Sequence, residues 1–115
     1  MSEKFIATGG FTQATTAIAV NIEIGFKPKC FRIFNETLGV YEEWNDQMAD
    51  AEGILNPGSV ASTVSKLITS NGITPILTES TSSPHTAPST IEGVTFGLDT
   101  TVNTASDVYT WVAFR

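Results

Sequence analysis

The last stretch of the chain, GVTFGLDTTVNTASDVYTWVAFR (Gly93–Arg115), holds the clearest strand signals in the sequence. Its segments 94–98 and 108–114 alternate apolar side chains with small or polar ones. Because successive side chains of a β-strand point to opposite faces, both segments are predicted to be strands, joined by a polar connection. The second has apolar side chains on both faces, which predicts an internal strand of a sheet.

The same alternation recurs upstream. Strands are predicted over 4–8, 17–24, 29–35 and 40–46, with Gly9-Gly10 ending the first and a turn at 35–39 joining the last two into a hairpin. Segment 60–69 fits a helix or a strand by spacing, and its Ser, Thr and Val content favours a strand. Asn71-Gly72, a preferred pair for a tight hairpin turn, is then expected to lead into a returning strand over 73–77.

The length of the chain and the spacing of its turn signals together predict the fold class. A chain of 115 residues is long enough for one core. Seven to eight short strands separated by turn signals predict an all-β fold, a single-domain antiparallel β-sandwich or jelly roll over residues 1–115.

The charge and hydropathy patterns exclude some partners. With a net charge of −6, the chain gains nothing from releasing phosphate counterions, so nucleic acid is not an expected partner. Lys27, Lys29 and Arg32 are interpreted as a solvated strand edge. No apolar run reaches membrane-spanning length, and the N-terminus lacks the apolar region of a signal peptide. We therefore expect no membrane partner, and synthesis in the cytoplasm.

No residue combination specifies a reaction. The single cysteine, Cys30, is predicted to be a small buried side chain, and the single histidine, His85, falls in the Ser/Thr-rich segment 78–90, a predicted exposed loop. Five acidic residues between Glu42 and Glu52 lack the spacing of a calcium loop. They are interpreted as a solvated or partner-facing edge, with Glu42 and Glu43 on opposite faces. No catalytic residue, metal or cofactor is predicted.

Aromatic side chains provide the candidate contact residues. Four of them could stack on a sugar ring, but aromatic residues are used more often in cores and subunit interfaces. The predicted interface residues are Phe34, Tyr41, Trp44, Tyr109 and Trp111.

Two parts of the chain resemble small virion structural proteins of tailed bacteriophages. The first is GFKPKCFRIFNETLGVYEEWNDQMADAEG (Gly25–Gly53), with its N-x-T turn at Asn35. The second joins NGITPI (71–76) to the C-terminal stretch, which contains the pattern G-[FV]-T-x-G-x-D-x-x-V-N over 93–103. The match consists of strand and turn residues, and it leaves out the N-terminal segment and the Ser/Thr-rich loop.

The resemblance implies a non-enzymatic virion component, and above all a capsid decoration (cement) protein. Such a protein is made in the host bacterial cytoplasm and binds the major capsid protein on the outer head surface. It does so as a homo-oligomer, with a homotrimer favoured over a dimer. The alternatives are a tail or baseplate component and a carbohydrate-binding host-attachment module.

Overall fold

The computed structural model describes residues 5–56, 65–76, 79–80, 89–90 and 92–115. Within these ranges every regular element is a β-strand, which confirms the all-β fold class. In chain order the strands are β1 (Ile6–Thr12), β2 (Val20–Glu23), β3 (Cys30–Asn35), β4 (Val40–Asn45), β5 (Glu52–Asn56), β6 (Lys66–Ile76), β7 (Glu79–Ser80), β8 (Ser89–Thr90), β9 (Gly93–Phe96) and β10 (Val108–Phe114).

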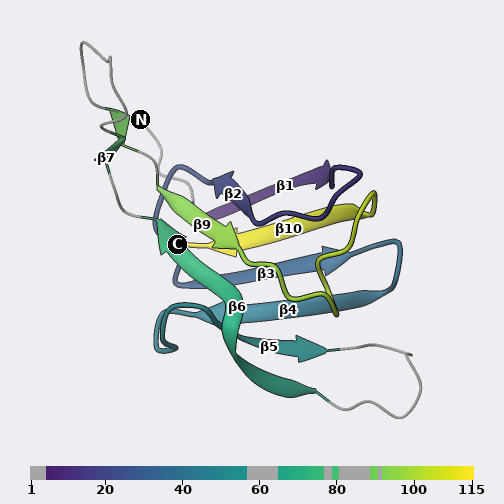
Figure 1. Ribbon diagram of the computed structural model, residues 1–115. Coiled ribbons are helices and arrows are strands. Elements are labelled where there is room, and N and C mark those ends of the chain that lie inside the picture. The colour runs from purple at the N-terminus through teal and green to yellow at the C-terminus, as the bar shows by residue number, and fades with distance from the viewer. Residues whose placement is uncertain (1–4, 57–64, 77–78, 81–88, 91) are drawn as a thin grey trace.

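Eight of these strands form one antiparallel sheet in the order β1-β10-β3-β4-β5-β6-β9-β2, and β7 pairs with β8 in a small ribbon apart from it. Figure 1 shows how the sheet curls: β1, β10, β3, β4 and β5 make one layer, and β2, β9 and part of β6 cross in front of it. The two halves of a single sheet thus face each other like the layers of a sandwich. The long strand β6 belongs to both halves.

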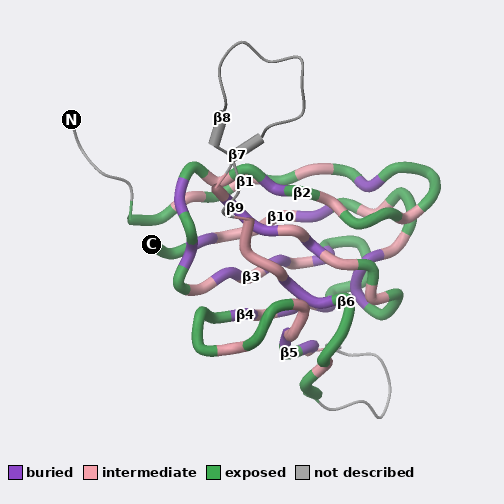
Figure 2. The backbone as a smooth tube through the Cα atoms, turned by 60° about the vertical axis from the view of Figure 1, so that its left-hand side comes forward, coloured by how far each residue is buried: buried purple, intermediate pink, exposed green. Residues whose placement is uncertain are grey.

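The core lies between the two halves and is filled by alternate residues of each strand. In β3, for example, Phe31 and Ile33 are fully buried, whereas Arg32 and Phe34, which alternate with them, are half-exposed. Among the described residues, thirteen buried hydrophobic side chains form one cluster that draws on both halves of the sheet. Figure 2 shows this alternation of buried and exposed residues along the strands. Burial of this shared apolar surface is the main stabilising term of such a fold.

The C-terminal strand β10 is internal, as predicted. It pairs with β1 on one side and β3 on the other. Tyr109 and Ala113 are fully buried, whereas Val108 and Phe114 are exposed. The preceding strand β9 does not pair with β10 but with β2 and β6, so the connection 97–107 crosses from one half of the sheet to the other.

The predicted break at Gly9-Gly10 is wrong, because β1 continues through both glycines to Thr12. The reason is the residue opposite. A Cβ atom on Gly9 would lie 2.5 Å from the indole ring of Trp111, and one on Gly10 would lie 2.8 Å from the carbonyl oxygen of Tyr109. Glycine within a strand often marks such a close approach, so these two residues let β1 pack against β10.

The predicted hairpin turn at Asn71-Gly72 is also wrong. The strand signal over 66–69 is confirmed, but β6 continues through Asn71 (φ 60°) to Ile76. The first part of β6 pairs with β5 and the last part with β9, with a register shift opposite Glu52/Gly53. The turn residues therefore make a corner within one strand, where the Gly72 amide donates to the carbonyl of Ala51 at 2.9 Å.

The other strand predictions are close to the structure. The hairpin of β3 and β4 is confirmed, and Gly39 has the positive φ (76°) expected in its turn. Strand β2 is shorter than the predicted 17–24. The Ser/Thr-rich segment contains β7 and β8, while 60–64 and most of 78–90, including His85, lie outside the described residues.

Candidate interaction surface

The strands β10, β3, β4 and β5 have one face that points away from the core, and this face carries most of the accessible apolar side chains described for these strands. The register places Thr110, Phe34 and Tyr41 side by side across three strands. A parallel row contains Val112, Arg32, Glu43 and Ile54. We call this face of β10, β3, β4 and β5 the outer face.

An aromatic pair stands near the centre of the outer face. The rings of Phe34 and Tyr41 lie 5.6 Å apart at an angle of 46°. The Tyr41 hydroxyl accepts a hydrogen bond from Nδ2 of Asn56 at 2.9 Å. The guanidinium of Arg32 lies 5.9 Å from the centre of the Tyr41 ring and is bonded at 2.5 Å to Glu43. These contacts hold the pair in one orientation.

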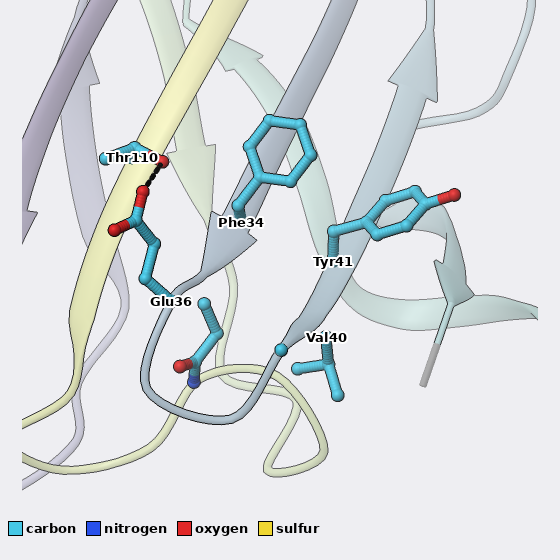
Figure 3. A pocket seen from close by; sticks show the side chains of 7 residues that line it. Phe34, Glu36, Val40, Tyr41 and Thr110 are labelled. Atoms are coloured by element: carbon cyan, nitrogen blue, oxygen red, sulfur yellow. Dashed lines mark hydrogen bonds between the residues drawn. The ribbon is translucent and has the colours of Figure 1, made fainter. Parts of the chain in front are cut away.

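A shallow depression of about 610 Å³ lies beside this pair, at the turn between β3 and β4. As Figure 3 shows, Phe34 and Tyr41 stand on one side of it, and Glu36 lies toward β10, where it accepts a hydrogen bond from the Thr110 hydroxyl at 2.7 Å. The lining residues are Phe34, Asn35, Glu36, Gly39, Val40, Tyr41 and Thr110. The depression offers ring faces and one carboxylate to a partner.

Further apolar side chains extend the outer face in both directions. Ile54 is 41% exposed and Leu67, its neighbour in register on β6, is 55% exposed. Val108, Phe114 and the adjoining Ile6 of β1 are exposed on the other side. By register these side chains lie on the same side of the sheet as Phe34 and Tyr41, and clustered apolar surface is a marker of interaction sites.

The structure retains two of the five predicted interface residues on this face and removes the others from it. Phe34 and Tyr41 are accessible and in contact with each other. Trp44 is 2% exposed and Tyr109 is 0% exposed, because both point into the core. Trp111 also points inward, over Gly9 and beside the ring of Phe31. Trp44 and Tyr109 are core residues, and Trp111 is partly buried and packs against the core, so the four aromatic residues do not assemble into a sugar-stacking platform.

Two smaller predictions also need correction. Arg32 does not lie at a solvated strand edge, since β3 is a central strand and Arg32 pairs with Glu43 across it. Cys30 is half-exposed on the outer face and is not fully buried. Partial burial raises the pKa of the Cys30 thiol, so the group stays protonated at neutral pH.

The acidic segment contains the residue that sequence reasoning missed. Glu42 and Glu43 point to opposite faces as predicted, but Glu42 is 0% exposed and belongs to the core, not to an acidic edge. Burial raises the pKa of the Glu42 carboxyl to about 8, and the charge of Asp99 adds to the rise. The signal was the position of Glu42 between Val40 and Trp44, on what became the buried face.

A second buried polar group closes one end of the core. The Asn35 side-chain oxygen accepts hydrogen bonds from the amides of Thr37 and Leu38, and its nitrogen donates to the carbonyl of Val102 at 3.0 Å. Asn103 donates to the carbonyls of Ile18 and Gly97, each at 3.0 Å. The Asn35 bond ties the loop 97–107 to β3, and the Asn103 bonds tie this loop to Ile18 and close it on Gly97.

The same loop is shaped by Asp99 and Tyr109. The Asp99 carboxylate accepts a bond from the Thr101 amide, and its carbonyl oxygen accepts bonds from the amides of Val102 and Asn103. The Tyr109 hydroxyl donates to the carbonyl of Val102 at 2.9 Å. Asn35, Asp99, Val102 and Asn103 all belong to the sequence patterns quoted above, so these patterned residues serve the fold.

Across the described ranges, no group of three or more His, Cys, Asp and Glu side chains is placed to hold a metal ion. The same ranges contain no helix long and apolar enough to cross a membrane. No family model, curated protein or solved structure matches the chain.

Proposed function

We propose that this chain is a non-enzymatic structural protein of a tailed-phage virion, a capsid decoration protein that binds the outer head surface as a homo-oligomer. The observation that carries the proposal is the outer face, where Phe34, Tyr41 and Ile54 remain accessible on a rigid sheet. Aromatic and aliphatic side chains held in place by a sheet lose little entropy on binding, which favours a stable protein contact.

The resemblance supports the same proposal from another side. Of its patterned residues, Asn35 ties the loop 97–107 to β3, and Asp99 and Asn103 form hydrogen bonds within that loop. A resemblance that rests on such residues concerns the fold and not a catalytic site. This suits a structural protein whose function is to hold its neighbours in place.

The aromatic residues argue against the sugar-binding alternative. Of the four that could form a stacking platform, Trp44 and Tyr109 are buried and Trp111 is packed against the core. Tyr41 is accessible beside Phe34 on the outer face, and the partly accessible Trp111 lies on the opposite face of the sheet. A tail or baseplate role would use the same outer face, so the choice between head and tail depends on the partner.

The test compares binding to phage heads that lack the protein with binding to isolated tails. We expect the chain to sediment as an oligomer and to bind heads. Ile54→Asp should abolish head binding, because it places a charge within the outer face. Ile18→Asp is the matched control: Ile18 is 52% exposed and lies outside that face, so its replacement should leave binding intact.

A monomer without affinity for heads would refute the proposal. Binding to tails alone would replace it with the tail alternative. Equal loss of head binding in both isoleucine variants would show that the outer face is not the contact surface. Thermal unfolding followed by circular dichroism establishes that each variant is folded before it is scored.

A further inference from the structure

Glu42 places a carboxyl group within an apolar core. It lies on the inner face of β4, in register with Ile33 of β3 and Leu55 of β5, and both of these neighbours are fully buried. In the described part of the chain, neither carboxyl oxygen of Glu42 has a hydrogen-bond partner. An ionised carboxylate in such a place loses its hydration without compensation, and that cost is far larger for the charged form than for the neutral acid.

The space around this carboxyl is provided by Gly53. A Cβ atom on Gly53 would lie 2.3 Å from Oε2 of Glu42. Gly53 is also the residue of β5 at which the register with β6 shifts. The carboxyl therefore lies where the sheet bends from one half to the other, in room created by a missing side chain.

Among the described residues, few charges act on Glu42, and none of them compensates it. The carboxylate of Asp99, in the loop after β9, carries the same sign and opposes ionisation. On β10, Tyr109 points inward, but its hydroxyl donates a hydrogen bond to the carbonyl of Val102 and not to Glu42. The remaining ionisable side chains of the neighbouring strands lie on the outer face, bond elsewhere or reach solvent: Cys30 and Arg32 on β3, Glu52 on β5 and Lys66 on β6.

We propose that Glu42 is a neutral carboxylic acid in the folded protein at neutral pH, and that the corner formed by β4, β5 and β6 opens more readily as the pH rises, because opening lets this carboxyl group ionise. The sign follows from linkage. The folded state holds this proton up to a pH of about 8, whereas the unfolded chain releases it near the ordinary value of 4.5. Stability is therefore greatest below the lower value and falls as the pH rises toward the upper one.

Two measurements on the whole chain test this proposal. In the first, the side-chain carboxyl carbons are followed by nuclear magnetic resonance during a pH titration. Glu42 should titrate with a midpoint near 8. In the second, amide hydrogen exchange is measured in β4 and β5 between about pH 5 and 8. After correction for the intrinsic pH dependence of exchange, protection should fall by about tenfold per pH unit.

Glu42→Gln keeps the shape of the side chain without the titrating group, so it should abolish the excess pH dependence of exchange. Glu43→Gln is the matched control, since Glu43 is the next residue but lies on the outer face against Arg32. It should leave the excess unchanged. The titration uses the unsubstituted protein, so the proposal stays testable even where a variant fails to fold.

A Glu42 midpoint near the ordinary value, or an excess pH dependence that survives in Glu42→Gln, would overturn the proposal. So would a calcium-dependent drop in the Glu42 midpoint, because the carboxyl would then be a cation ligand and not a neutral acid. These outcomes are independent of whether the chain binds phage heads.

Discussion

The contact between Gly53 and Glu42 gives the sharpest test of the packing. In Gly53→Ala the added methyl carbon would lie 2.3 Å from Oε2, 3.0 Å from Cδ and 3.1 Å from Cγ of Glu42. Overpacking a filled core costs about 1–3 kcal/mol, and replacing a strand glycine by alanine returns about 0.5–1 kcal/mol through the unfolded chain. We therefore expect Gly53→Ala to lower the free energy of unfolding by about 1–2 kcal/mol.

Glu42→Ala should reverse the sign of that effect, because the new methyl group then enters space that the carboxyl has left. The double-mutant cycle should show a coupling of about 1–3 kcal/mol. Urea unfolding followed by tryptophan fluorescence provides the free energies, at about pH 5, where Glu42 ionisation contributes little.

The matched cycle pairs Gly53→Ala with Glu43→Ala. Glu43 lies on the opposite face of β4, so this cycle should be additive. The reasoning fails if Gly53→Ala costs the same in the Glu42→Ala background as in the unsubstituted protein. It also fails if the Glu43 cycle shows the same coupling.

Three further results are expected. Gly9→Ala should lower the free energy of unfolding by about 1–3 kcal/mol, because a Cβ there meets the indole ring of Trp111, and near-ultraviolet circular dichroism should show that the indole has moved. Asn103→Ala should cost about 2–4 kcal/mol in urea unfolding, since the carbonyls it bonds near 3.0 Å lose their donor; an effect within error would mean that these bonds do not hold the loop. The free energy of unfolding should fall with rising pH between about 4.5 and 8 by up to about 1.4 kcal/mol per pH unit relative to Glu42→Gln, and parallel profiles for the two proteins would contradict the burial of an uncompensated acid.

The proposed outer face and the buried acid follow from the same alternation on neighbouring strands. On β4, Tyr41 and Glu43 point outward to Phe34 and Arg32, while Glu42 points inward. A one-residue slip of this strand would exchange the two sets. The hairpin register with β3 therefore determines which side chains a partner can reach.

The sequence by itself determined that this protein is built of strands and where several of them lie, because strand alternation is a local property. It predicted the positions of β3, β4 and β10, the turn with Gly39, the opposite directions of Glu42 and Glu43, and the all-β class. Phe34 and Tyr41, two of the five residues predicted for an interface, lie in contact with each other on the outer face, and their part in an interface stays a prediction. These predictions needed no knowledge of which strands are neighbours.

Only the tertiary structure decided which face of each strand is buried and how the sheet closes. Alternation shows that Tyr109 and Val108 point in opposite directions, but Tyr109 is buried because β9 packs against it, with the Phe96 ring 5.5 Å from its own. Gly9 interrupts a strand by its local preference, yet Trp111, far away in the chain, covers it and keeps β1 whole. Glutamate usually lies at the surface, yet Glu42 is buried because Ile33 and Leu55 flank it on adjacent strands. Each of these outcomes depends on a contact between residues that are distant in sequence, and a local pattern carries no information about such contacts.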